Sequence, residues 1–541
     1  MFLNKKVNIY KVTVYVSVII TLIATPNFNK DALIIPKVIL LFLLALFMLP
    51  VILSLRKLFN QTIIYKYLLV IIVLILVQIA LITIASNAPI EQQMFGRTGR
   101  GLGLLTLVSF FILLIGSALV ANKSLINVLF FGLMLSGSLS SLYAVFQSFG
   151  LDFFPWDSRT NGVIGTLGNP NFISSFAAMT ILPAFFYTKA KFNNVVFPLI
   201  LTLLFVFTIY RAQSYQGYIA FIIALSIFFV IYFWFKSKII FILAGSIFIF
   251  SSVLTAYGFF NKGPLAGLLY KSSVQSRGEF WGAAINASND NPFFGVGLDS
   301  FGDYSLKYRS SAIINEYTDS AHNYLLDFSS NGGYPLATLY LMIILLTMYC
   351  FYRIQKQLST FNSSIAVLFS TYLVFQAQSL ISPINIPLMV WNLLISGTVI
   401  GLAANLSVND KMEIHNQKIG LGSIASILIG LIFVFPYFNS DRLQLQAMNN
   451  SDGDLAIKVA KMYPESVVRY SVLTRALLAS GLNSQALDLA YSAVKFNPNS
   501  PALLALILIN PNAPIAERVE VKEKLLILDP LNNELKNFLI Q

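Results

Sequence analysis

Long apolar stretches separated by short polar connections dominate the first 440 residues of the chain. Each stretch is long enough for a helix that crosses the ~30 Å hydrocarbon core of a bilayer. The pattern predicts an all-α, polytopic transmembrane helical bundle of about 12 to 13 spans. The predicted spans are residues 9–25, 33–55, 63–86, 101–121, 125–148, 172–188, 194–210, 216–235, 238–257, 333–352, 363–380, 386–405 and 418–438.

One polar segment interrupts this pattern. Residues 258–332 form a long connection that is rich in arginine, carboxylates and glycine and ends in Ala321-His322-Asn323. His322 is one of only 2 histidines in the chain. Because polar and titratable groups gather in this large loop, we expect any chemistry to be centred there.

The apolar pattern changes again after the last predicted span. Residues 440–541 carry charges at helical spacing, and Pro464, Pro498 and Pro530 recur at intervals of 34 and 32 residues. A 34-residue period is typical of tetratricopeptide repeats. We therefore predict two domains, a transmembrane domain at 1–439 and a tetratricopeptide-like helical repeat domain at 440–541. Generic helical hairpins are the alternative. Repeat arrays bind proteins on a concave face, so a protein partner is expected.

Composition excludes a soluble globular protein. Hydrophobic residues make up 57% of the chain and charged residues 11%, and the mean hydropathy is +0.74. The single cysteine excludes a disulfide framework. The net charge of +13 does not indicate nucleic acid, because no soluble segment carries a basic stripe with interleaved aromatic residues.

The distribution of cations predicts the orientation. If the N-terminus lies inside, short cytoplasmic connections hold most of the lysines outside the C-terminal domain, as the positive-inside bias requires. The large loop and the C-terminal domain then lie on the outer face. Arginine forks grip phosphate or carboxylate, so the outer arginines suggest an anionic ligand, although some could cap helices or pair with carboxylates. These are Arg97, Arg100, Arg159, Arg211, Arg277 and Arg309.

An ordered set of motifs lies on this outer side. Arg159 and three glycines precede Asn169-Pro170-Asn171, a helix start whose free N–H groups favour an anion. Arg211 precedes Ser214-Tyr-Gln-Gly217. The loop then contains Ser276-Arg277-x-x-x-Trp281, Pro292-x-x-Gly295-x-Gly297 and Ala321-His322-Asn323.

This ordered set resembles the O-antigen ligase and O-antigen polymerase superfamily over about residues 95–401. Members with a C-terminal tetratricopeptide-like domain include bacterial protein O-oligosaccharyltransferases. The resemblance implies transfer of a glycan from a polyprenyl-diphosphate carrier to an acceptor lipid, glycan or protein, at the outer face of the bacterial cytoplasmic membrane. It leaves the choice of acceptor open.

The implied chemistry assigns roles to individual residues. A neutral histidine suits removal of the acceptor's proton, so His322 is expected to be the general base, and Arg277 and Arg211 complete the catalytic set. Further expected donor-diphosphate contacts are Arg159, Arg309, Asn169 and Asn171. Asn323 and Asp319 are expected to orient the histidine. Glu279 is expected as a supporting residue and is another candidate base.

Other chemistries and functions are less well supported by the residues. No metal-binding spacing, Walker loop or dinucleotide fingerprint occurs, so neither a metal nor a cofactor is expected. Polymerisation of glycan repeat units stays an alternative to ligation. A non-enzymatic flippase for the same lipid-linked glycan is also possible, but it would place ionisable groups inside the spans, and these are nearly free of charge.

Overall fold

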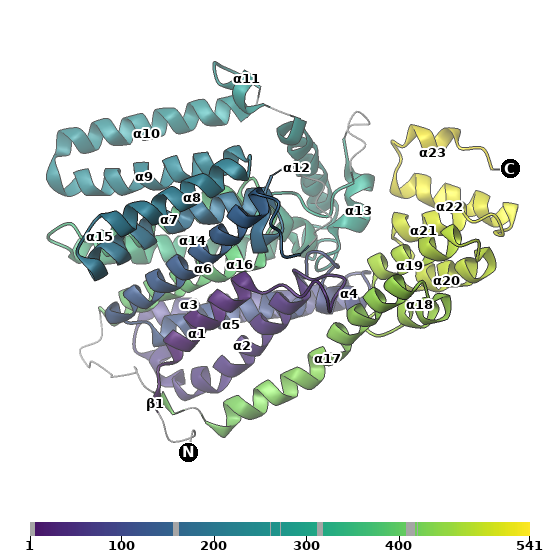
Figure 1. The fold of residues 1–541 in the computed structure, drawn as a ribbon, viewed down its shortest axis with the longest axis horizontal. Helices are drawn as coiled ribbons and strands as arrows, with labels where there is room; N and C mark the ends of the chain where they lie inside the picture. Colours follow the sequence, from purple (N-terminus) through teal and green to yellow (C-terminus); the bar gives the residue numbers. More distant parts are fainter. Residues whose placement is uncertain are drawn as a thin grey trace.

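The computed structural model describes residues 6–154, 162–259, 261–270, 272–310, 317–406, 417–418 and 420–540. Within these residues the protein is all-α, as predicted, apart from one antiparallel pair of two-residue strands, β1 (Lys6–Val7) and β2 (Gln417–Lys418). Figure 1 shows a bundle of long helices from which the helix α17 leads to a smaller group of helices at the C-terminus.

One helix corresponds to each predicted span. Among the described residues, 9 helices are long and apolar enough to cross a membrane, which makes the chain a multi-pass membrane protein. They are α2 (Ile35–Ser54), α3 (Ile63–Ala85), α6 (Ile126–Ser148), α7 (Pro170–Phe192), α9 (Tyr215–Lys236), α10 (Lys238–Phe259), α14 (Tyr324–Gln357), α16 (Ile386–Asn405) and α17 (Leu421–Asn450). Shorter helices at the other predicted spans are α1 (Ile9–Leu22), α5 (Leu104–Val120), α8 (Val196–Arg211) and α15 (Ser363–Ser379).

The helices differ greatly in how much of their surface is buried by the rest of the protein. The candidate span of α16 is fully buried, and Gly397 and Gly401 let its backbone approach Ser117 and Ala118 of α5. In contrast, α10 has only Gly258 buried and packs mainly on α9. Lipid can solvate such an apolar helix, whereas water could not, so the contrast fits a bilayer-embedded bundle with α16 at its centre.

The large loop is folded into helices. It contains α11 (Ala266–Leu269), α12 (Ser272–Asp290) and α13 (Phe301–Tyr308), while α4 (Ile90–Phe95) lies in an earlier connection. Short 3-10 helices are η2 (Arg56–Asn60), η3 (Lys123–Leu125) and η4 (Gly165–Leu167). The loop therefore supplies rigid elements that can position side chains.

A glycine contact fixes the loop to the bundle. Gly333 has φ +76 and kinks α14, and a Cβ at Gly333 would lie 2.4 Å from the carbonyl carbon of Phe293. The Tyr334 amide donates to the Pro292 carbonyl at 2.8 Å, and the Val296 amide donates to Ser330 at 2.8 Å. Gly295 and Gly333 thus allow a close approach between the backbone at residues 292–296 and the backbone at residues 330–334.

The C-terminal helices have their own core. They are α18 (Gly453–Ala460), α19 (Val467–Ala479), α20 (Asn483–Phe496), α21 (Pro501–Leu508), α22 (Ile515–Leu528) and α23 (Asn533–Asn537). The predicted boundary at residue 440 falls inside the continuous helix α17. Gly481 turns between α19 and α20 with φ +76, and Ala486, Ala490 and Ala493 are buried between the helices, as expected for paired helices. Membership of the tetratricopeptide class stays a prediction.

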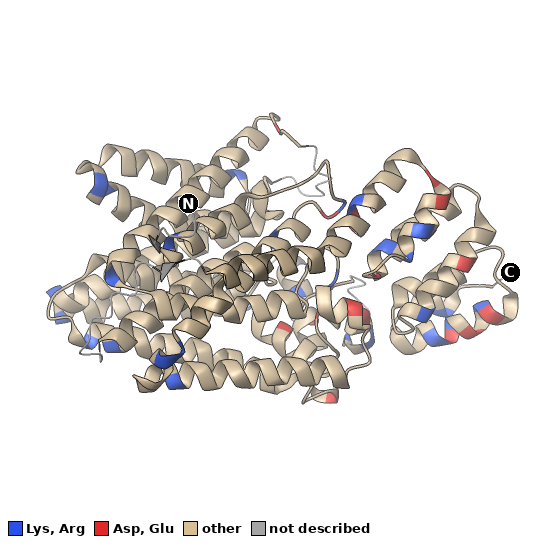
Figure 2. Ribbon diagram, turned by 90° about the horizontal axis from the view of Figure 1, so that it is seen from below, with Lys and Arg blue, Asp and Glu red and all other residues tan. Residues whose placement is uncertain are grey.

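The bundle has two chemically different ends. The strand β1 pairs with β2 at one end, whereas the large loop and the C-terminal helices lie together at the other. Figure 2 shows Lys and Arg at both ends, whereas most of the Asp and Glu patches lie on or near the C-terminal helices. The orientation in the membrane stays a prediction.

Candidate functional site

His322 sits in a tight turn directly before α14. It has φ +55, a left-handed conformation that is uncommon for a residue other than glycine. The backbone amide of His322 donates to the Ser320 hydroxyl at 3.0 Å, and ring atom Nδ1 lies 3.2 Å from the Ser320 carbonyl oxygen. A carbonyl can only accept, so Nδ1 carries the proton and Nε2 keeps a lone pair.

A buried carboxylate holds this turn from behind. Asp327, on the first turn of α14, accepts hydrogen bonds from the Ala321 amide at 2.8 Å and from the Ser320 hydroxyl at 2.8 Å. Asn323 caps the same helix by accepting from the amides of Leu325 and Leu326. The backbone on both sides of His322 is therefore fixed.

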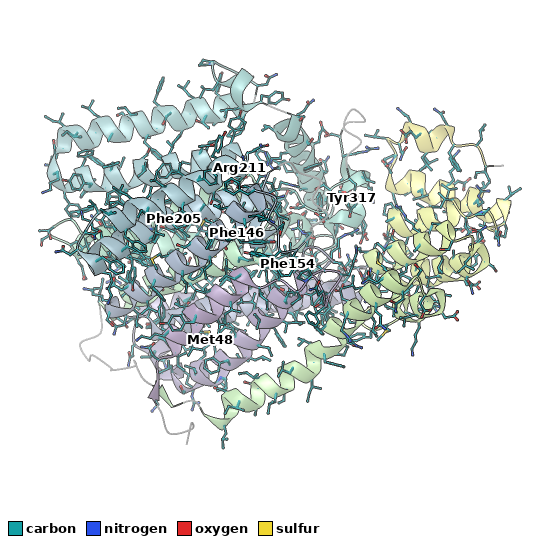
Figure 3. All side chains as sticks on the ribbon, viewed as in Figure 1. Met48, Phe146, Phe154, Phe205, Arg211 and Tyr317 are labelled. Carbon is teal, nitrogen blue, oxygen red and sulfur yellow. The ribbon has the colours of Figure 1, made fainter. Side chains whose placement is uncertain are left out.

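Asp327 belongs to a buried ion-pair network between the loop before α5 and the large loop. Arg100 contacts Asp299 at 3.2 Å, Asp319 at 3.4 Å and Asp327 at 3.5 Å. Arg97 contacts Asp303 at 3.0 Å and lies 5.5 Å from the ring centre of Tyr317, which Figure 3 labels beside α13. Burial opposes the charge of both arginines, but the surrounding carboxylates outweigh it and raise their pKa values. Arg97 and Arg100 thus pair with carboxylates, the alternative foreseen for the outer arginines.

The helix α12 forms the opposite wall of the site. The ring of Phe280 lies 5.3 Å from the imidazole of His322, centre to centre. Arg277 and Trp281 are four residues apart, so they share one face of α12. Their Nε and Nε1 atoms are buried and find no hydrogen-bond partner among the residues that the structure describes. Burial lowers the pKa of Arg277.

The electrostatics keep His322 neutral. Burial lowers its pKa most, the contact with Ser320 raises it, and the charges of Arg277 and Arg100 lower it further, to about 4. Arg277 and His322 are therefore close enough to interact electrostatically. At neutral pH the ring has a free lone pair beside an arginine that has no carboxylate partner among the described residues.

The predicted donor turn assembles against the start of α9. Asn169 caps α7, and its side chain accepts from the amide of Asn171 at 2.8 Å. The Ser214 hydroxyl, at the start of α9, donates to Asn171 at 2.6 Å. Arg211, labelled at the end of α8 in Figure 3, donates to the Ser148 carbonyl at 2.6 Å. The expected donor contact Arg159 lies outside the described residues.

Buried amides connect this turn to the histidine segment. Gln216, near Ser214, donates to Gln378 of α15 at 3.2 Å. Two residues earlier on α15, Gln376 accepts from the Tyr324 hydroxyl at 3.1 Å. Tyr324 is two residues after His322, so α15 makes hydrogen bonds to the start of α9 and to the start of α14.

Three expected residues have other contacts in the structure. The guanidinium of Arg309 contacts Asp529 of the C-terminal region at 2.6 Å, so it is an interdomain ion pair. Glu279 accepts from the Ser310 hydroxyl at 3.3 Å. Asn323 caps α14, and the His322 ring contacts the Ser320 carbonyl, while the orienting roles of Asn323 and Asp319 stay predictions.

Sequence reasoning missed Ser320 and Asp327, and it found Trp281 only as part of a motif without a role. Asp327 had one visible signal, because a carboxylate close before a long apolar run is costly unless it is paired. Ser320 carried no such signal. Among the described residues no group of His, Cys, Asp and Glu side chains could hold a metal ion.

One family model matches part of the chain. Residues 200–341 match the family model Wzy_C, O-antigen ligase. Neither a curated protein nor a solved structure matches the chain. The matched segment includes Arg211, Arg277, His322 and the Gly333 kink. The chain therefore carries, in the middle of a multi-pass membrane protein, the O-antigen ligase domain of membrane glycan ligases and polymerases.

Proposed function

We propose that the protein transfers a glycan from a polyprenyl-diphosphate carrier to an acceptor hydroxyl at the outer face of the bacterial cytoplasmic membrane. His322 acts as the general base and Arg277 binds the diphosphate. The acceptor class, whether lipid, glycan or protein, is left open.

One observation carries the proposal. A neutral imidazole lies within electrostatic reach of Arg277, and the helix α12 that packs its Phe280 on this imidazole carries two buried N–H donors without a described partner, on Arg277 and Trp281. Buried donors without partners are costly in a folded protein. A phosphate oxygen is the acceptor that a guanidinium fork and a neighbouring N–H fit best. An anionic ligand between these groups would give the buried N–H donors of Arg277 and Trp281 the acceptor that they lack.

The reaction needs little covalent help from the protein. The acceptor oxygen attacks the anomeric carbon, while the bond from that carbon to the diphosphate oxygen breaks and the diphosphate leaves with the electron pair. Nε2 of His322 takes the acceptor's proton. Arg277 stabilises the charge that develops on the diphosphate, in a site where burial strengthens the interaction.

The turn around Asn169 and Arg211 supports a second contact with the donor. The helices α7 and α9 both start there, and the free N–H groups of helix starts attract anions. We assign Arg211, Asn169, Asn171 and the undescribed Arg159 to the donor half of the site. We assign Asp319 a supporting role through its ion pair with Arg100, and Glu279, on α12, a supporting role in the wall that faces His322.

Reconstituted vesicles with a polyprenyl-diphosphate glycan and an acceptor test the proposal. His322→Ala and His322→Gln should abolish transfer, while His415→Gln, the same change at the other histidine, should retain it. Full transfer by both His322 variants would refute the assignment of the base. Movement of the donor across the bilayer without transfer would identify a flippase.

A further inference from the structure

The short helix α13 is held at both ends by the C-terminal region. At its start, Asp303 accepts from the side chain of Asn497 at 3.0 Å, and both residues are buried. Directly after its end, Arg309 contacts Asp529 at 2.6 Å, with side-chain exposures of 6% and 5%. In the figures, too, α13 lies beside the C-terminal helices.

The same helix is part of the framework behind His322. Asp303 uses one oxygen for Arg97 at 3.0 Å and shares the other between Gln92 and Asn497. Asp299, just before α13, accepts from the Arg97 amide and from Arg100. Arg100 in turn contacts Asp327, which holds the backbone of the histidine turn. Displacing α13 would therefore disturb the support of His322.

A second connection runs through α12. The helices α12 and α13 pack against each other, and Asn286 of α12 donates to the Tyr308 carbonyl at the end of α13 at 3.0 Å. Because α12 carries Arg277, the position of α13 also affects the wall that faces the histidine. The support of His322 and the position of Arg277 thus both depend on α13.

We propose that the C-terminal helices are an integral part of the transferase, in which Asn497 and Asp529 are positioning residues that act on the site through α13. The proposal rests on the function proposed above. It assigns the C-terminal region a task apart from any recruitment of a protein partner.

Charge reversal tests the contact at the end of α13. In the full-length protein in vesicles, Arg309→Glu and Asp529→Arg should each lower transfer by about tenfold or more, because each places like charges together in a buried site. The double variant should regain most of the rate. The matched control is Glu520→Lys with Lys524→Glu, which reverses an exposed ion pair on α22 and should leave transfer unchanged.

The pH profile separates positioning from general loss of folded protein. The charges that act on the imidazole are Arg277, Arg100 and Asp319. If the framework loosens, His322 becomes better solvated, its pKa rises, and the acid limb of transfer moves to higher pH. A smaller amount of intact protein would lower the rate and leave the limb in place, and that result would overturn the proposal.

A nearly isosteric change provides a second variant. Asn497→Asp keeps the oxygen that accepts from the Asn499 amide but turns the donor to Asp303 into a second carboxylate. This variant should lower the rate of transfer and move the acid limb of the pH-rate profile to higher pH, as Arg309→Glu and Asp529→Arg should. The positioning role would be refuted if Asn497→Asp, Arg309→Glu and Asp529→Arg all kept the wild-type transfer rate and the wild-type acid limb. If His322→Gln stays active while these variants lose transfer, the assignment of the base fails and the coupling stands.

Discussion

The carboxylate of Asp327 accepts a hydrogen bond at 2.8 Å from the backbone amide of Ala321, the residue directly before His322. The helix that follows the histidine thus reaches back to hold the turn that precedes it. The left-handed conformation of His322 is strained for a histidine, and such strain persists where the surrounding contacts fix the backbone.

Replacing Asp327 by Asn should weaken this support. The amide can accept only one of the bonds well and loses the charge that faces Arg100, so we expect transfer to fall about tenfold to a hundredfold. Initial rates per amount of folded protein in vesicles measure the effect. Asp290→Asn, an exposed change at the end of α12, serves as the control. Equal rates for the two variants would contradict the role of Asp327.

The pH dependence of transfer follows from the lowered pKa of His322. The base works only when neutral, so the rate should stay nearly constant from pH 8 down to about pH 5 and fall as the pH approaches its pKa of about 4. An unperturbed histidine would lose activity near ~6.5. A pH-rate profile measured in vesicles distinguishes the two. The same depressed pKa means that this group's contribution to folding stability is present above ~6.5 and is lost as the pH falls towards 4.

Arg277→Lys tests recognition of the diphosphate by a guanidinium fork. Lysine keeps the positive charge but lacks the paired N–H groups, so transfer should fall about tenfold or more, with a higher KM for the donor. Arg475→Lys, on an exposed position of α19, should have no effect. Unchanged kinetics in Arg277→Lys would mean that only charge matters there.

The Gly333 kink predicts a strong effect on stability. Gly333→Ala would place a Cβ 2.4 Å from the carbonyl carbon of Phe293 at a positive φ, and we expect a loss of about 1–3 kcal/mol. Thermal unfolding in detergent measures it. Gly245→Ala, in α10, meets no atom within 4 Å and should not lower the melting temperature. A Gly333 variant as stable as the Gly245 variant would show that the contact between Phe293 and Gly333 is loose.

The sequence predicted the spans and the principal motif residues because both signals are local. Apolar runs fix the helices, and Arg277 and His322 stand out in a polar segment. The partners of the other arginines of the large loop and of the loop before α5 could not be predicted, because they come from distant parts of the chain. Arg100 and Asp299 are 199 residues apart, and Arg309 and Asp529 are 220 apart. For this reason the sequence indicates Arg309 as a donor contact, whereas the structure places its guanidinium against Asp529.

Asp303 also connects the site to the order in which the chain is made. It bonds Arg97, which is 206 positions earlier, and Asn497, which is 194 positions later. A ribosome completes the transmembrane bundle before it reaches residue 497, so a nascent chain already embedded in the bilayer still lacks one partner of this carboxylate. The C-terminal helices must dock before the framework behind His322 is closed, so a chain that stops before residue 497 would be inserted in the membrane but would lack this contact.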